Sequence, residues 1–371
     1  MINLLSIAPY SFLPAQGGGQ KAIYLLYKYI SMKVYLTVVS TKSNKPEKVN
    51  YSVFKFFSDS PFRYINLFYY YKINRLVKKK KITHLSIEHP YMGLLGLYVK
   101  YQCNLKFVIR SHNIESLRFK TIGKWWWWML FYYERYVHRR ADHSFFITEE
   151  DRLYAVKHYK LKEEKTSVLT YGTEIYTALS EQEKKAQVNK LKAEHGIPES
   201  ATLLLFNGTF DYEPNLMALK LLLDHTMPLI LDRDPNCFLI VCGKNIPKEI
   251  AAKEYKQVKI LGFVDDIHAV FKGAEIFLNP VWIGGGIKTK LVEALGYGCS
   301  AVSFSNGALG IPQGIVDRKI TVVKDLDYHT FAEEVIKIKP TIYDITPHKF
   351  YFQFGWENIA QRFVDKINVI D

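Results

Sequence analysis

The chain has 371 residues, of which 48% are hydrophobic, and a formal net charge of +14. This length favours two domains with separate cores, and no apolar run approaches the roughly 18 to 20 residues that a membrane-spanning helix needs. The four cysteines lack Cys-x-x-Cys spacing, which argues against a zinc or redox motif and favours buried free thiols.

The positive charge is confined to one half of the chain. Residues 1–180 contain 28 Lys and Arg against 12 Asp and Glu, whereas residues 181–371 contain 22 against 24. We therefore expect the first half to meet an anionic partner.

The N-terminal half alternates apolar runs with helical stretches, a pattern typical of a parallel sheet covered by helices. It predicts a first domain over residues 1–175, with strands at residues 4–8, 34–39, 84–87, 107–111 and 143–148. The first residues lack the features of a signal peptide, so the protein is expected in the cytoplasm.

A second series of strands follows a charged helix predicted over residues 182–195. These strands predict a second domain over residues 195–349, and they lie at residues 202–206, 238–242, 258–261, 276–279 and 300–304. The aromatic segment 350–371 is predicted to be helical and to pack back on the first domain. The expected fold class is α/β, with two Rossmann-like, doubly wound domains whose ligands bind beyond the carboxyl ends of the strands.

One loop after a predicted strand is unusually informative: Gly284-Gly285-Gly286-Ile287-Lys288-Thr289-Lys290-Leu291-Val292-Glu293-Ala294. It joins a buried strand to a helix over residues 288–295, whose first-turn amides and dipole favour phosphate. Two lysines add charge, and Glu293 can accept hydrogen bonds from two ribose hydroxyls. The alternative is a glycine turn before an ordinary amphipathic helix.

Five other motifs occur earlier in the chain, in a specific order and spacing. They are Gly17-Gly18-Gly19-Gln20-Lys21, Ser111-His112-Asn113-Ile114-Glu115, residues 206–215, Val241-Cys242-Gly243 and Gly262-Phe263-Val264-Asp265-Asp266. With these motifs the chain resembles, over nearly its whole length, the GT-B glycosyltransferases of the retaining group 1 family, family 4. The resemblance implies two domains facing across a cleft, with a nucleotide-sugar held mainly by the second domain and an acceptor by the first.

The resemblance also implies roles for single residues. Glu293 matches the glutamate that binds ribose, Lys290 a lysine near the diphosphate, and Val264 the residue whose backbone meets the base. The amides of Gly18 and Gly19 would reach the diphosphate from the first domain, where a side chain would keep the backbone away. Other donor contacts are expected at Gly208, Thr209, Gly243, Gly285, Gly286 and Lys288.

Two departures from the family pattern concern the donor site. The Glu-x7-Glu motif would place a glutamate at Gly285, so this chain resembles a glycine-rich variant group. Thr209 and Asn215 occupy positions where many members have an arginine and a lysine, and we expect Lys288 and Lys290 to supply that charge.

His112 follows an apolar run, so it is expected at the carboxyl end of a strand. By resemblance it contacts the donor sugar or the reacting centre, and with Lys290 it forms the expected catalytic pair; Glu115 is a weaker candidate. The alternative is a histidine that caps the following helix. In retaining members a donor phosphate oxygen is the usual proton acceptor, so a dedicated base is not required.

Metal ions or preorganised amides and lysines can stabilise a leaving diphosphate. The segments Asp232-Arg233-Asp234 and Asp325-Leu326-Asp327 match the Asp-x-Asp pattern of metal-dependent glycosyltransferases of another fold, but such short patterns are common. The first is predicted to be a turn. We expect no metal and no other cofactor.

Two aromatic and basic segments of the first domain suggest where the acceptor binds. One ends in Lys78, Lys79, Lys80 and Lys81, and the other contains Trp126 within a run of four tryptophans. Such segments suit an anionic membrane surface, which predicts a glycan or lipid-linked acceptor. The alternative is a solvated helix end beside tryptophans that belong partly to the core.

Two other functions compete with the enzyme. A nucleic-acid-binding protein would carry similar patches, but it leaves the glycine loops unexplained, so no nucleic acid is expected. A noncatalytic GT-B scaffold is supported only by the missing glutamate. The sequence therefore predicts a metal-independent, retaining glycosyltransferase of cell-envelope polysaccharide synthesis, cytoplasmic and peripheral on the inner face of the membrane.

Overall fold

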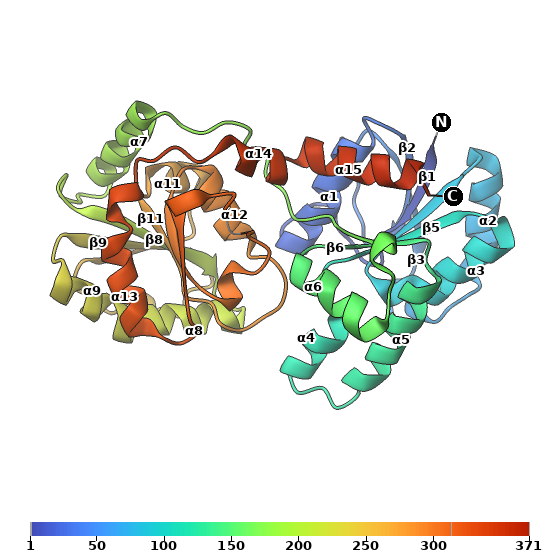
Figure 1. Ribbon diagram of the computed structural model, residues 1–371, viewed down its shortest axis with the longest axis horizontal. Coiled ribbons are helices and arrows are strands. Elements are labelled where there is room, and N and C mark those ends of the chain that lie inside the picture. Colours follow the sequence, from blue (N-terminus) through green and yellow to red (C-terminus); the bar gives the residue numbers. More distant parts are fainter. Residues whose placement is uncertain (1, 313, 371) are drawn as a thin grey trace. The chain divides into compact units, whose positions relative to one another are not determined.

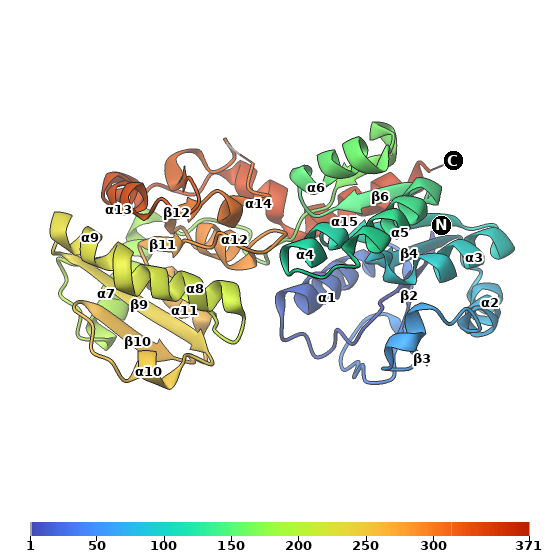
Figure 2. The ribbon, with the colours of Figure 1, turned by 90° about the horizontal axis from the view of Figure 1, so that it is seen from below.

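A computed structural model describes residues 2–312 and 314–370, which divide into two compact units. Unit 1 contains the residues up to Gly172 and those from Trp356 onward, and unit 2 is Thr173–Gly355. Each unit is one parallel sheet with helices on both faces (Figure 1, Figure 2). The expected α/β class with two doubly wound domains is confirmed.

The sheet of unit 1 has the order β3-β2-β1-β4-β5-β6-β7. Its strands are β1 (Asn3–Ile7), β2 (Tyr35–Thr41), β3 (Ser52–Phe57), β4 (His84–Glu88), β5 (Lys106–Ser111), β6 (His143–Phe146) and β7 (Thr166–Val168). Its helices include α1 (Gly18–Ile30), α2 (Tyr69–Lys80), α3 (Gly93–Cys103), α4 (Glu115–Thr121), α5 (Trp127–Arg140), α6 (Glu149–Tyr154) and α15 (Trp356–Asn368).

Successive side chains of β1 point to opposite faces of the sheet, so their contacts show which helices cover each face. Leu5 and Ile7 join a buried cluster to which α2, α3 and α5 contribute. Ser6 points to the other face and hydrogen bonds to Tyr27 of α1 at 2.5 Å, and α15 lies beside α1 (Figure 1). Residues 107–109 of the central strand β5 are all buried, as both-sided coverage requires.

The sheet of unit 2 has the order β10-β9-β8-β11-β12-β13. Its strands are β8 (Thr202–Thr209), β9 (Cys237–Lys244), β10 (Val258–Gly262), β11 (Ile276–Asn279), β12 (Ser300–Phe304) and β13 (Ile320–Val323). Its helices include α7 (Glu181–Glu194), α8 (Glu213–Leu221), α9 (Met227–Arg233), α10 (Lys248–Ala251), α11 (Ile267–Gly273), α12 (Thr289–Gly296), α13 (Tyr328–Lys337) and α14 (His348–Phe354). One face packs on α8, α9 and α13, and the other on α7, α11, α12 and α14.

Strand order reverses direction once in each sheet, between β1 and β4 in unit 1 and between β8 and β11 in unit 2. In doubly wound sheets, ligands bind at the carboxyl ends of the strands that flank such a reversal. The loops after these four strands are therefore the places to look for a site.

The structure differs from the sequence prediction in several elements. Strands β3, β7 and β13 were not predicted, and each is an edge strand with partly exposed residues. The segment 350–371 is two helices and not one, because the chain leaves helical geometry at Gly355. Helix α15 packs on unit 1 as expected, whereas α14 belongs to unit 2. Unit 2 begins before residue 195, since α7 packs on α11 of the same unit.

The structure also places the two Asp-x-Asp segments and the four cysteines. Asp232 and Arg233 are not in a turn but end α9, and Asp327 caps α13 by accepting a hydrogen bond from the Thr330 amide at 3.0 Å. The four cysteines are free, three of them buried and Cys103 partly exposed. In residues 2–312 and 314–370, no helix is both long and apolar enough to cross a membrane.

Candidate active site

Two glycines lie side by side at the carboxyl ends of β8 and β9. Gly208 is the register partner of Gly243, and Gly243 has φ +144°. A β-carbon on Gly243 would lie only 1.8 Å from the Gly208 carbonyl oxygen, so a side chain cannot be accommodated there. The strand ends thus present bare backbone next to the loop after β8.

The loop after β11 is the predicted glycine stretch. Gly284 and Gly286 have φ +100° and +69°, conformations that glycine adopts without strain. A β-carbon on Gly284 would lie 2.8 Å from the Tyr212 hydroxyl oxygen, so this loop packs close to the loop after β8. The Lys288 ammonium donates to the Gly284 and Gly286 carbonyl oxygens at 3.0 and 3.1 Å.

Lys290, in the first turn of α12, connects the end of the glycine stretch to β8 and α8. Its ammonium donates to the Asn207 carbonyl oxygen at 2.9 Å and to Asn215 Oδ1 at 3.0 Å, and it lies 4.5 Å from the centre of the Phe206 ring. Burial, with the nearby charge of Lys288, lowers the pKa of Lys290 to about 7. An anionic ligand would favour its protonated form.

The remaining predicted donor contacts also lie near the carboxyl edge of this sheet. Thr209 ends β8, and its carbonyl oxygen accepts from Asn215 Nδ2 at 3.0 Å. Glu293 lies one turn into α12 and is half-buried, whereas Gly285 is exposed. Val264 follows β10 and packs its side chain on the core, so its backbone is the part available to a ligand.

In unit 1, the loop Gly17-Gly18-Gly19 opens α1, and all three glycines are exposed. The Gln20 side chain accepts hydrogen bonds from the Gln16 and Gly17 amides at 2.9 and 3.0 Å, which fixes the entry of the chain into the helix. Gly18 and Gly19 are the first two residues of α1. Their amides therefore have no hydrogen-bond partner within the helix.

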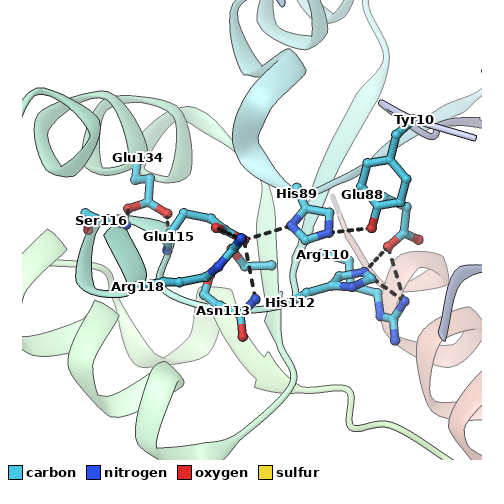
Figure 3. Close-up of polar contacts among 11 residues, drawn as sticks. Tyr10, Glu88, His89, Arg110, His112, Asn113, Glu115, Ser116, Arg118 and Glu134 are labelled. Carbon is cyan, nitrogen blue, oxygen red and sulfur yellow. Dashed lines mark hydrogen bonds and ion pairs between the residues drawn. The ribbon is translucent and has the colours of Figure 1, made fainter. Parts of the chain in front are cut away.

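His112 lies just beyond β5 within a buried array of polar side chains, which Figure 3 shows. Its Nε2 is 2.6 Å from Glu88 Oε2, and Arg110 Nη1 donates to the same oxygen at 3.2 Å. A second histidine, His89, has its Nδ1 3.1 Å from Glu115 Oε1, and Arg118 donates to the other oxygen of Glu115 at 2.8 Å. The site thus holds two carboxylate–histidine pairs, each backed by an arginine.

The two histidine rings are 4.0 Å apart, so their charges are coupled. Burial, with the charges of His89 and Arg110, lowers the pKa of His112 to about 3. Burial alone would raise the pKa of Glu88, but Arg110 and His112 hold it below its usual value. His112 is therefore neutral near pH 7 and donates through Nε2–H to an ionised Glu88.

His112 does not cap the following helix, which corrects the alternative considered above. Glu134 of α5 caps α4 instead, because its two oxygens accept from the Glu115 and Ser116 amides at 3.0 and 2.9 Å. Burial raises the pKa of Glu134 to about 6. Because Glu134 caps the helix, the His112 ring remains in the buried polar array beside Glu88.

Several residues of these sites were not predicted. Glu88 and His89 follow the predicted strand 84–87, so the rule that selected His112 would have found them. Tyr10 lies after β1, with its hydroxyl oxygen 3.0 Å from His89 Nε2. Arg110 is wholly buried in β5 and carries no sequence signal.

The predicted membrane and acceptor residues lie on helices of unit 1. Lys78, Lys79 and Lys80 form the last turn of α2 and Lys81 follows it; all four are exposed. Trp126 precedes α5, is half-buried, and packs on Phe119 with ring centres 4.7 Å apart. Over the described part of the chain, no cluster of three or more His, Cys, Asp or Glu side chains could hold a metal ion.

Comparison with protein families gives two matches. A model described as Glycosyltransferase Family 4 matches residues 16–175, and one described as Glycosyl transferases group 1 matches residues 201–339. No curated protein matches the chain.

Solved structures are similar over almost the whole chain. Sucrose-phosphate synthase from Thermosynechococcus elongatus aligns over 99% of this chain and 98% of its own, with TM-score 0.74 and 14% identity. Anabaena HepE in complex with UDP aligns over 99% and 100%, with TM-score 0.74 and 13% identity. WaaG, a glycosyltransferase involved in lipopolysaccharide biosynthesis, aligns over 97% and 95%, with TM-score 0.59 and 15% identity. Identities this low demonstrate a shared fold alone.

Proposed function

The chain belongs to the group 1, family 4 glycosyltransferases of the GT-B fold, and from that premise we propose that it builds a cell-envelope polysaccharide or lipid-linked glycan. The donor is a nucleotide-sugar, the acceptor a glycan or lipid-linked sugar, and the configuration at the transferred sugar is retained. The observation that carries this proposal is the glycine loop at the start of α12, with Lys290 and Glu293 on the same helix.

In this proposal the leaving diphosphate binds to the amides of residues 284–286 and to the first turn of α12. Lys288 and Lys290 neutralise its developing charge in place of a metal ion, and exchange their contacts with protein carbonyl oxygens for phosphate oxygens. Glu293 accepts the ribose hydroxyls. HepE, which shares the fold, binds UDP and UDP-glucose, which supports a nucleotide-sugar as the donor class.

His112 contributes as a neutral hydrogen-bonding group near the sugar, not as a general base. A group whose pKa is about 3 binds a proton too weakly to accept one efficiently at neutral pH. The acceptor's proton therefore goes to a phosphate oxygen of the donor. Glu88 holds the ring of His112 at 2.6 Å and so fixes its orientation.

The acceptor side of the proposal rests on the surface formed by α2, α3 and α5. Exposed apolar and aromatic residues follow each helix at helical spacing: Phe68 and Tyr71; Leu94, Tyr98 and Tyr101; Trp128, Tyr132 and Tyr136. The segments 61–87, 91–114 and 116–141 contain one acidic residue, Glu134, and it is buried. An aromatic, mainly basic surface suits the headgroup region of an anionic membrane, so we propose a cytoplasmic enzyme that binds the membrane peripherally.

Calorimetric titration with UDP, GDP and ADP, with and without Mg²⁺, tests the donor site. We expect one nucleotide to bind with an affinity that Mg²⁺ does not change, and Glu293→Ala to weaken it about tenfold or more, because two charge-assisted hydrogen bonds to ribose are lost. Glu249→Ala, an exposed position on α10, serves as the matched control. Absence of binding by all three nucleotides would favour the noncatalytic scaffold, and turnover of the matching nucleotide-sugar would exclude it.

A further inference from the structure

A cavity of about 670 Å³ lies within unit 1, at the edge of the sheet opposite to His112. It is lined by Asn3, Tyr35 and Ser52, which are the first residues of β1, β2 and β3. The amino ends of parallel strands lie at one edge of the sheet, whereas His112 follows the carboxyl end of β5. The proposed transfer reaction uses the carboxyl edges of the sheets, so it assigns no role to this cavity.

Four polar side chains of these strands point to the same face of the sheet. Asn3 is the register partner of Tyr35, and Thr37 is the register partner of both Leu5 and Ser52. Register partners share a face, and successive residues of a strand alternate between faces. Leu5 belongs to the buried cluster to which α2 contributes. The four polar residues therefore lie on the α2 side of the sheet, and all four line the cavity.

Along β2 the core gives way to the cavity. Val39, Thr37 and Tyr35 are alternate residues on one face, and their exposed fractions are 0%, 6% and 67%. Thr37 is thus nearly buried, yet its hydroxyl makes no hydrogen bond with any other described residue. Tyr51 also lines the cavity, and its buried hydroxyl has no partner in the described part of the chain. Buried polar groups are rarely left unbonded, so two such hydroxyls on residues that line one cavity point to a polar occupant.

Three consecutive lysines bring positive charge to this cavity. Lys79, Lys80 and Lys81 line it where α2 ends, and none of the described residues that line it is acidic. Within residues 2–312 and 314–370, no hydrogen bond or ion pair engages the ammonium groups of these lysines. Asn3 Nδ2 donates to the Lys80 and Lys81 carbonyl oxygens at 3.3 and 2.9 Å, which attaches this end of α2 to the sheet. The three ammonium groups are therefore available to an anion.

The ligand class follows from size, charge and hydrogen bonding together. Pockets of roughly 300–1,000 Å³ hold small organic molecules, so this cavity is larger than a single inorganic anion requires. Lysines bind phosphate as point charges, whereas hydroxyl and amide side chains both donate and accept hydrogen bonds. A phosphate ester that also carries hydroxyl groups satisfies both parts of the lining. Lysines at a helix end are common by themselves, but here the cavity and the unbonded hydroxyls are separate observations that point to a ligand.

We propose that this cavity binds a hydroxylated phosphate ester, with its phosphate at Lys79, Lys80 and Lys81 and its hydroxyl groups at Thr37 and Ser52. The ligand is bound and not transformed, so no covalent bond forms or breaks. Two sources have this chemistry: a soluble sugar phosphate, and the headgroup of a lipid such as phosphatidylglycerol. The inference does not depend on nucleotide binding. With a lipid as the source, it adds to the proposed membrane surface a site that selects a headgroup by its hydroxyl groups and not by charge alone.

Calorimetric titration of the full-length protein tests the soluble ligand. Glucose 6-phosphate, sn-glycerol 1-phosphate, glucose and inorganic phosphate are compared, with UDP, GDP and ADP present to occupy the donor site. We expect at least one of the two esters to bind about tenfold more tightly than glucose or inorganic phosphate. Thr37→Val removes a hydroxyl without changing the charge, and it should weaken ester binding about fivefold. Thr202→Val is the matched control, because Thr202 is also 6% exposed but lies at the start of β8 in unit 2.

Flotation with vesicles distinguishes the two sources. Phosphatidylglycerol and phosphatidylserine carry the same net charge, but only the phosphatidylglycerol headgroup has hydroxyl groups. A preference for phosphatidylglycerol that Thr37→Val abolishes identifies the lipid headgroup, whereas ester binding without such a preference identifies the soluble ligand. Ser52→Ala, at an exposed position, repeats both measurements if Thr37→Val does not fold.

Three results would overturn the inference. They are the absence of both ester binding and a lipid preference, ester binding that occurs only without nucleotides, and equal binding by Thr37→Val and the wild type. Each of them leaves the proposed function standing, because the nucleotide titrations test that function separately.

Discussion

Asp151 illustrates how far burial alone can change a side chain's chemistry. It lies in the first turn of α6, its Oδ2 has no hydrogen-bond partner, and its amide donates to Thr148 Oγ1 at 3.1 Å. Burial, together with the charges of Glu150, Glu134 and Glu115, raises its pKa to about 7. The folded protein therefore holds a proton at Asp151 that the unfolded chain releases near pH 4.

The sign of the resulting pH effect follows from this difference. A carboxyl whose pKa is raised in the folded state stabilises the fold less as pH increases from about 4 to about 7, and its contribution is constant above that range. A shift of about three pKa units corresponds to about 4 kcal/mol. We predict that Asp151→Asn gains stability relative to the wild type across this interval, measured as the free energy of unfolding in urea at pH 4 to 8. Parallel pH curves for the two proteins would contradict the prediction.

At the scale of elements, the contact between β8 and β9 shapes the donor site. Their register pairs Gly208 with Gly243 at the carboxyl edge, and the space between them is too small for one methyl group. The strands continue to Thr209 and Lys244, so this pairing also sets where the loop after β8 begins. Lys290 depends on the two elements that this loop joins, because its oxygen contacts are Asn207 of β8 and Asn215 of α8.

We predict that Gly243→Ala destabilises unit 2 by about 2 kcal/mol or more, through overlap with the Gly208 carbonyl and an unfavourable φ. The melting temperature of the full-length protein measures this effect, and nucleotide affinity should fall with it. Gly196→Ala is the matched control, since Gly196 also has a positive φ, of +63°, but a β-carbon there would have no neighbour within 4 Å. Equal losses in the two variants would show that backbone strain, and not the overlap, is responsible.

At the scale of the whole molecule, charge and chemistry are divided between the two units. The excess of Lys and Arg falls in residues 1–180, and nearly all of this segment belongs to unit 1. The residues proposed to hold the nucleotide are mainly in unit 2. In unit 1 the basic residues accompany exposed aromatic rings on α2, α3 and α5. The distribution is consistent with one unit that meets a surface and another that binds the donor.

Sedimentation with liposomes tests this division. We predict binding to vesicles that contain anionic phosphatidylglycerol and little binding to phosphatidylcholine alone, with the difference reduced at high salt because surface charges are screened. Replacing Lys78, Lys79, Lys80 and Lys81 by Gln should weaken the binding. A matched variant that replaces Lys248, Lys253, Lys256 and Lys259 of unit 2 by Gln should leave it unchanged. Salt-independent binding, or none, would remove the membrane from the proposed function.

The sequence was a good guide where backbone pattern decides the structure. The predicted strands at residues 4–8, 107–111 and 276–279 overlap β1, β5 and β11, since strands buried on both faces give unbroken apolar runs. The edge strands β3, β7 and β13 were missed because their exposed residues weaken that signal. The break at Gly355 was also missed, since a helical pattern does not reveal which unit each part will join.

By itself the sequence determined the fold class, the family and the positions of the glycine loops, because these depend on local residue types whose backbone preferences act over a few positions. Only the tertiary structure decided which polar side chains meet. His112 and Glu88 are 24 positions apart, and Lys290 and Asn207 are 83 apart, so their contacts arise from strand order and helix packing. These contacts also set the protonation states, because the pKa of a side chain depends on its burial and on neighbouring charges. Both come from residues elsewhere in the chain and cannot be read from the titratable residue itself.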